Sequence, residues 1–364
     1  MQQRLYHIIP YGAMAFCFAL LVLVTACGGQ DDPVVENEDK LELSDKEICI
    51  EIDEWKPMTE SRASIFESQD DFLYANETKT LGNDFTLYAF TRGSDTPFIN
   101  GTRVNYQVRT DGGENRWRFY AYPNYIEYYW PQTGMFDFFA LMPYGDRQKN
   151  ITKVEYNKTS GNVILTCQMQ TTTESLEDPN GQETIFAYTK DLNKESGNVN
   201  MHFVHPFSAV NFKLEKSHSK LKINSIKFEN IYLGGSITLS DKTTAETNVE
   251  WTPTGSTATF TIPVDKAVGE GEGKIYYGDD IGENFLVMPQ TFTDQAKITI
   301  TYTWRDEINS FSHPIKTNQI SGWEAGNKYL YKLSLGDNTQ EEIFLDVEVV
   351  PWAPGGAKNE IDVE

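Results

Sequence analysis

The sequence predicts an all-β protein built from antiparallel β-sandwiches. Nearly every apolar segment alternates with a period of two or is too short to form a helix. Aromatic residues make up 13% of the chain and Thr is abundant, and both favour strands. Clusters of Gly, Asn, Asp and Pro separate the apolar runs, and no amphipathic segment extends beyond two helical turns. Short strands joined by turns are typical of sandwich domains.

The alternation is clearest in three segments, which we predict to be strands. Residues 84–91 place Phe85, Leu87 and Ala89 on one face, and residues 297–304 alternate in the same way. Residues 343–349 put their aliphatic side chains on one side. A further strand is expected over residues 201–214. Turns are predicted at residues 111–113, 160–162 and 234–235, where Gly, Asn or Asp cluster.

The first 27 residues have the features of an export signal. Arg4 precedes an apolar stretch over residues 16–24 that is too short to span a bilayer. The sequence from Val24 to Cys27 resembles the lipobox of bacterial lipoproteins. This resemblance implies cleavage before Cys27 and lipidation of that cysteine, which would anchor the protein in the membrane. The alternative is an ordinary signal peptide with an incidental cysteine.

Residues 28–45 are predicted to be a disordered tether, because they are rich in acids and contain no aromatic residue. Residues 28–32 resemble the acidic surface-export signal of lipoproteins in Bacteroidota, although a merely solvated tether would look the same. The remaining length predicts two domains, over residues 46–190 and 200–364, on either side of a polar stretch.

The charge of the chain argues against nucleic-acid binding. The full chain has a formal net charge of −22, and removal of residues 1–27, with one basic and no acidic residue, makes it −23. A nucleic-acid partner would require a basic surface. The negative charge instead suits solubility in an exposed location.

No motif for catalysis or cofactor binding is recognisable, so we expect no enzyme, cofactor or metal site. His202 and His205 form an H-x-x-H pattern, but in a strand they would lie on opposite faces and could not share a metal. Cys49 and Cys167 are the cysteines outside the signal region, and two unpaired thiols are favoured over a disulfide.

An aromatic cluster between residues 117 and 130 has two interpretations. Exposed rings could stack on sugars, whereas buried rings would fill a sandwich core. The core interpretation is favoured because it is the commoner fate of aromatic residues in β domains. The cluster consists of Trp117, Phe119, Tyr120, Tyr122, Tyr125, Tyr128, Tyr129 and Trp130.

Several motifs, in this order behind the lipobox, resemble the fimbrillin-like family. They lie at residues 129–131, 136–143, 205–214, 285–290 and 323–331. The resemblance covers most of residues 46–364. It implies two tandem transthyretin-like antiparallel β-sandwich domains and a subunit of surface fimbriae in Bacteroidota.

The resemblance also implies a mechanism of assembly. In the resembling proteins an arginine-specific protease removes the first strand, and an extended strand from a neighbour fills the groove. Here residues 47–55 would be the removable strand, and cleavage would fall between Arg62 and Ala63. Arg62 is the only arginine between the signal and Arg92. The donor strand would be the run 343–350, with four inward residues: Ile343, Leu345, Val347 and Val349.

Each of these assignments has a plainer alternative. Arg62 could be an ordinary loop arginine, and residues 343–350 could be the final strand of their own domain. The expected function is a fimbrial subunit or adhesin that is exported as a lipoprotein to the outer membrane and surface-exposed, then part of the fimbrium. Its expected partners are other fimbrial subunits and a receptor on a host or bacterial surface. The alternative function is a monomeric surface glycan-binding lipoprotein.

Overall fold

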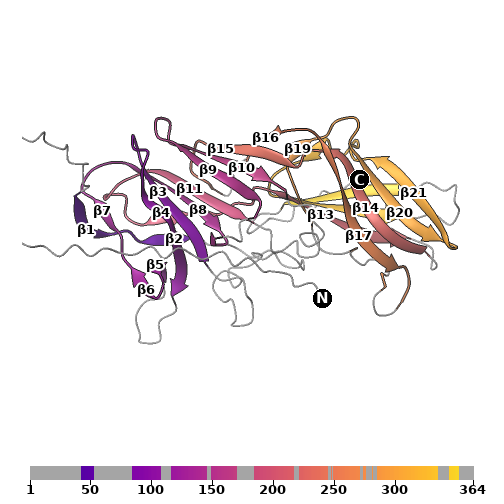
Figure 1. The fold of residues 1–364 in the computed structure, drawn as a ribbon, viewed down its shortest axis with the longest axis horizontal. Coiled ribbons are helices and arrows are strands. Elements are labelled where there is room, and N and C mark those ends of the chain that lie inside the picture. The colour runs from indigo at the N-terminus through magenta and orange to yellow at the C-terminus, as the bar shows by residue number, and fades with distance from the viewer. Residues whose placement is uncertain are drawn as a thin grey trace, which may run out of the picture. The chain divides into compact units, whose positions relative to one another are not determined.

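The structure is a computed structural model. It describes residues 42–52, 84–107, 116–145, 149–169, 184–216, 221–244, 247, 249–270, 274–275, 281, 285–334 and 344–351. All regular elements in these ranges are strands, so the predicted all-β class is confirmed (Figure 1). None of the described segments forms a helix that could cross a lipid bilayer.

The largest sheet has its strands in the order β11-β8-β3-β4-β5-β2-β12, with β6 paired to β5. Val204, just after β12, exchanges two backbone hydrogen bonds with Phe186 of β11, with N···O distances of 2.9 and 3.2 Å. The two ends of the sheet therefore meet. The strands are β2 (Ile50–Ile52), β3 (Asp84–Thr91), β4 (Pro97–Gln107), β5 (Arg116–Ala121), β6 (Asn124–Ile126), β8 (Phe136–Met142), β11 (Ile185–Leu192) and β12 (Val199–Met201).

Three strands of this sheet are buried on both faces. On one face of β8, Phe138 and Ala140 belong to a core inside the curled sheet. On the other face, Phe139 and Leu141 pack against a second sheet, with the order β16-β15-β10-β9. The same two-sided burial occurs in β3 and β11. The second sheet consists of β9 (Ile151–Asn157), β10 (Asn162–Gln168), β15 (Gly234–Leu239) and β16 (Trp251–Thr254).

The second sheet combines strands from both sides of the polar stretch at residues 190–199. β10 pairs antiparallel with β15 from Val163, opposite Leu239, to Gln168, opposite Gly234. By their contacts, Leu41–Glu364 form one unit. The division into domains 46–190 and 200–364 stays a prediction.

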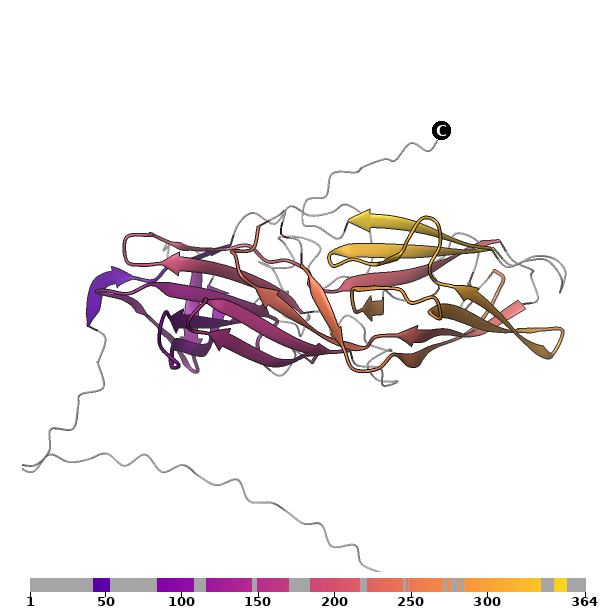
Figure 2. The same ribbon diagram turned by 90° about the horizontal axis from the view of Figure 1, so that it is seen from above.

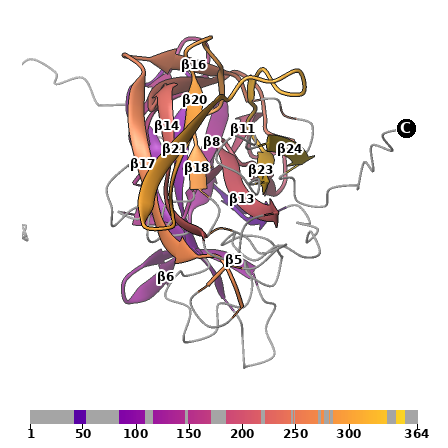
Figure 3. The ribbon, with the colours of Figure 1, turned by 90° about the vertical axis from the view of Figure 1, so that its right-hand side faces the viewer.

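The C-terminal part contains a sandwich of two four-stranded sheets (Figure 3). One sheet has the order β18-β13-β23-β24 and the other β17-β14-β20-β21. The strands are β13 (Ser208–Lys216), β14 (Leu221–Ile231), β17 (Ala258–Ala267), β18 (Phe285–Val287), β20 (Lys297–Trp304), β21 (Glu307–Pro314), β23 (Asn327–Ser334) and β24 (Phe344–Pro351). Two short pairs complete the description: β1 (Leu43–Glu47) with β7 (Tyr129–Pro131), and β19 (Gln290–Thr291) with β22 (Gly322–Trp323).

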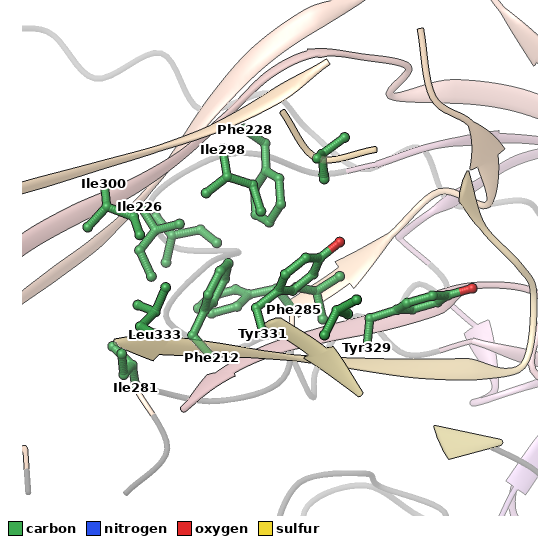
Figure 4. Close-up of a cluster of buried hydrophobic side chains, with 14 of the residues drawn as sticks. Phe212, Ile226, Phe228, Ile281, Phe285, Ile298, Ile300, Tyr329, Tyr331 and Leu333 are labelled. Atoms are coloured by element: carbon green, nitrogen blue, oxygen red, sulfur yellow. The ribbon is translucent and has the colours of Figure 1, made fainter. Parts of the chain in front are cut away.

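Large side chains from both sheets fill this sandwich. Phe212 of β13 and Tyr331 of β23 lie on one side, facing Phe228 of β14 and Ile298 of β20 (Figure 4). All four are at most 1% exposed. The Tyr331 hydroxyl is 3.1 Å from the indole nitrogen of Trp323, which donates to it, so the buried polar groups of these two rings are paired.

Two local predictions were wrong. Gly234 and Gly235 begin strand β15 rather than a turn. A Cβ on Gly235 would lie 2.9 Å from both the Met288 sulfur and the Thr252 carbonyl oxygen, so glycine is needed there for close packing. The strand expected over residues 201–214 is interrupted, because β12 ends at Met201 and β13 begins at Ser208, with Pro206 between them.

Candidate functional site

The N-terminal residues 42–52, here called the plug segment, lie within the fold rather than beside it. β1 pairs antiparallel with β7 (Figure 1), and β2 lies between β5 and β12 in the large sheet. Ile50 is opposite Trp117 in β5 and opposite Val199 in β12. The pairing is antiparallel to β5 and parallel to β12. A strand that occupies this position must therefore have a defined direction.

The isoleucines of the plug segment lie on the inward face. Ile48 is 2% exposed, Ile50 is 4% exposed, and Ile52 packs partly buried against the same core. Their neighbours in this core include Trp117 and Phe119. Full burial of a large aliphatic side chain contributes about 1.5–3 kcal/mol. The segment is thus a substantial part of the core.

Backbone hydrogen bonds hold the plug segment on both sides. The amide of Ile48 donates to the Tyr128 carbonyl oxygen at 2.7 Å, and the amide of Val199 donates to the Cys49 carbonyl oxygen at 2.8 Å. The amide of Gln132 donates to the Glu42 carbonyl oxygen at 2.7 Å. Removal of the segment would leave the Tyr128 carbonyl oxygen and the amides of Gln132 and Val199 without these partners.

Polar side chains hold the outward face of the plug segment. Arg116 Nη1 lies 3.3 Å from Glu47 Oε2, and Asn198 donates to the Glu51 carboxylate. Lys46 Nζ is 2.8 Å from Glu195 Oε2 and 3.2 Å from the Lys194 carbonyl oxygen. Lys46 lowers the pKa of Glu195 through this hydrogen bond, but the pair is exposed and contributes little.

These contacts were not predicted from the sequence. The composition of residues 190–199 predicts a polar stretch between domains. Nothing in it indicates that these residues contact residues 42–52. The only signal was the excess of polar residues, which a linker shares. Pairing between segments so far apart in the chain has no local signature.

Cys49 lies on the face opposite the isoleucines and is half-buried. Burial raises the pKa of its thiol. Cys167 is 3% exposed, and burial raises its pKa to about 12. Both are free thiols.

The predicted donor run ends the C-terminal sandwich as β24. This strand is at the border of its described sheet, where it pairs antiparallel with β23 and with no other described strand (Figure 2). Val347 is 8% exposed and belongs to the sandwich core, whereas Val349 is 42% exposed. Leu345 is paired by its backbone with Leu333. Ile343 lies outside the described residues.

The remaining predicted site residues lie outside the described residues or outside the strands. Cys27, Arg62 and Ala63 lie outside the described residues, and so do residues 53–55 of the removable strand. His202 and His205 follow β12 rather than lying in it. Within the described ranges, no three His, Cys, Asp or Glu side chains gather closely enough to hold a metal ion.

The aromatic cluster divides between the two interpretations. Trp117, Phe119 and Trp130 are at most 9% exposed and belong to the core. Tyr122 is 89% exposed in the connection between β5 and β6. Tyr120 lies near it, with ring centroids 6.5 Å apart, and Tyr125 lies 5.3 Å from Tyr120. The hairpin thus carries a small group of tyrosines outside the core.

Comparison with known proteins identifies a family. A family model described as fimbrillin-like matches residues 68–352. No curated protein matches the chain. A solved structure of a candidate cell adhesion protein from Bacteroides uniformis is 16% identical, with a TM-score of 0.50 over 84% of this chain and 99% of the other.

Two further structures are also those of candidate cell adhesion proteins. The protein from Bacteroides ovatus is 16% identical, with a TM-score of 0.47 over 85% of this chain and 98% of its own. The protein from Bacteroides eggerthii is 11% identical, with a TM-score of 0.47 over 86% of this chain and 97% of its own. At these identities, the Bacteroides uniformis structure supports the fold alone.

Proposed function

Because the chain belongs to the fimbrillin-like family, we propose that it is the precursor of a fimbrial subunit or adhesin that assembles by strand exchange. The role is structural rather than enzymatic. The observation that supports it is the position of β2. This strand pairs with β5 and β12 inside the large sheet, yet it belongs to an N-terminal segment that a single cut could release.

Cleavage between Arg62 and Ala63 changes the balance between the plug segment and a competing strand. Before cleavage the segment is tethered, so it re-enters its position as part of the same chain. After cleavage it dissociates as a separate peptide. The position between β5 and β12, here called the slot, then exposes an apolar groove and unpaired backbone groups. An extended strand from another subunit satisfies both, as in β-strand addition.

The donor run 343–350 fits such a role by its pattern and its place. Its inward residues in the slot are Ile343, Leu345, Val347 and Val349. Among the described strands β24 pairs only with β23, so it can leave without separating any of the others. Leaving costs the β23–β24 ladder and the burial of Val347. Entry into the slot of a second copy restores a ladder on both sides.

We further propose that Cys27 carries a lipid anchor and that the precursor is held at the outer membrane, surface-exposed, before it enters the fimbrium. Detergent phase partitioning tests this anchor. Wild-type protein is expected in the detergent phase and Cys27→Ala in the aqueous phase. Equal partitioning of the two proteins would contradict the proposal that Cys27 carries a lipid anchor.

The experiment that tests the function is treatment of purified precursor with an arginine-specific protease. The expected result is loss of residues 27–62 followed by ladders or filaments. A folded Val347→Asp variant, which places a charge in the slot, should be cut but should not assemble. A wild-type protein that is cut and remains monomeric contradicts the proposal.

The exposed Tyr122 favours one alternative, a monomeric glycan-binding lipoprotein. Exposed tyrosine rings stack on sugar faces. Retention on immobilised oligosaccharides that is lost in Tyr122→Ala, by a cut protein that stays monomeric, would favour this alternative over fimbrial assembly.

A further inference from the structure

The plug segment and the donor run resemble each other beyond their aliphatic residues. Residues 47–53 read Glu-Ile-Cys-Ile-Glu-Ile-Asp, and residues 342–348 read Glu-Ile-Phe-Leu-Asp-Val-Glu. Aligned in this way, every inward aliphatic residue matches an aliphatic residue, and every outward acid matches an acid. The two strands thus present the same pattern to the groove and to its rim.

We propose that a second copy's donor run enters the slot in this register, with Glu342 in the place of Glu47 and Asp346 in the place of Glu51. The inference rests on the proposed function and specifies how the exchange is made. Ile343, Leu345 and Val347 then occupy the places of Ile48, Ile50 and Ile52.

Two residues of the groove rim distinguish this register from its neighbours. Arg116 contacts Glu47, and Asn198 contacts Glu51, from opposite sides of the plug segment. Both lose a carboxylate partner when the segment leaves. A donor that supplies acids at both places restores both contacts. Arg116 points to the face of β5 opposite the core residue Trp117, so its side chain lies at the rim of the groove.

In two alternative registers, the donor residues that fill these places lie two or four positions further along the chain. Both registers keep the inward alternation, but each loses one of the two contacts with Arg116 and Asn198. A shift by two puts Glu348 beside Asn198 but Phe344 beside Arg116. A shift by four puts Asp346 beside Arg116 but Val350 beside Asn198. The larger shift also puts Pro351, which has no backbone N–H, at the place of Ile52.

The direction of the donor follows from the same sheet. It must run parallel to β12 and antiparallel to β5, as β2 does. In the proposed register the amide of Ile343 replaces that of Ile48 as donor to the Tyr128 carbonyl oxygen. The carbonyl oxygen of Phe344 replaces that of Cys49 as acceptor for Val199.

One contact of the plug segment is lost in this register. Glu341 takes the place of Lys46, which pairs with Glu195 in the intact chain. The two side chains are 50% and 68% exposed, so the resulting repulsion is screened by solvent and small.

Disulfide trapping reads the register directly. Asn200 is the paired residue of Glu51 in the parallel β2–β12 ladder and is exposed. Neighbouring strands lie about 4.8 Å apart, which a disulfide can bridge. Asn200→Cys is combined with Asp346→Cys for the proposed register, with Glu348→Cys for the shift by two, and with Val350→Cys for the shift by four.

The native cysteines do not interfere. Cys27 and Cys49 leave with the cleaved segment, and Cys167 is buried. Each double variant is cut with an arginine-specific protease, oxidised and run on a non-reducing denaturing gel. The expected result is a covalent ladder at least tenfold more abundant for Asp346→Cys than for the other two. A stronger ladder for Glu348→Cys or Val350→Cys overturns the register while leaving strand exchange intact.

Charge exchange gives a second readout. Arg116→Glu should slow assembly at least tenfold, and the added change Glu342→Lys should restore it. Rescue by Asp346→Lys in place of Glu342→Lys, or by neither, contradicts the register. Wild-type protein that is cut but forms no assembly at all contradicts the proposed function, and the register with it.

Discussion

The backbone nitrogen of Val199 lies 2.8 Å from the carbonyl oxygen of Cys49, to which it donates a hydrogen bond. Val199 belongs to β12, and β2 is the only strand of the described sheet that pairs with β12. The segment that leads into the C-terminal sandwich is therefore fastened to the N-terminal plug segment. Release of the plug must affect both.

Hydrogen exchange measures this dependence. In a Val347→Asp protein that is cut but cannot assemble, we expect the Val199 amide to exchange faster than in the uncut protein, because its acceptor has left. The Leu87 amide in β3, away from the slot, is the internal control and should change less. Equal protection of Val199 before and after plug release would show that β12 is held by other contacts.

The inward isoleucines should stabilise the precursor. Ile50→Ala is expected to lower the free energy of unfolding by about 2–5 kcal/mol, because it opens a cavity beside Trp117. Leu43→Ala is the matched control in the same segment, since Leu43 is 53% exposed and should change stability by less than about 0.5 kcal/mol. Denaturant midpoints of the uncut proteins give both values. Similar effects of the two substitutions would contradict the inward assignment.

Close packing at Gly235 predicts a further loss of stability. Gly235→Ala would bring a methyl group to within 2.9 Å of Met288 and of the β16 backbone, which we expect to cost about 1–3 kcal/mol. Ser236→Ala, the next residue in β15, is the control and should have a smaller effect. Thermal unfolding of both variants is the measurement. A neutral Gly235→Ala would mean that β15 and β16 can separate without cost.

Local patterns predicted the strands well where alternation was complete. Residues 84–91 and 297–304 form strands with the predicted bounds, because Phe85, Leu87 and Ala89 in the first and Ile298 and Ile300 in the second are buried in a core. The same reasoning accounts for the inward positions of Ile48 and Ile50. It mistook Gly234 and Gly235 for a turn, because their role depends on a neighbouring backbone and on Met288, which no local pattern reveals.

Long-range pairing accounts for what the sequence could not predict. The pairing of β10 with β15 and the contacts of residues 194–198 with the plug segment join distant parts of the chain. An alternation with a period of two indicates that a residue lies in a strand, but it does not indicate which strand lies next to it. The donor assignment is of the same kind: β24 is a strand as expected, but its pattern fits both β23 and the slot.

The most direct test of strand exchange is the fate of an uncuttable precursor. Wild-type, Arg62→Ala and Arg62→Lys proteins are incubated with an arginine-specific protease and analysed by size-exclusion chromatography and intact mass; Arg62→Lys keeps the charge while removing the cleavage site. We predict that only the wild type loses residues 27–62 and assembles, because the tethered plug otherwise keeps the slot filled. Assembly of Arg62→Ala with residues 27–62 still attached would contradict the account.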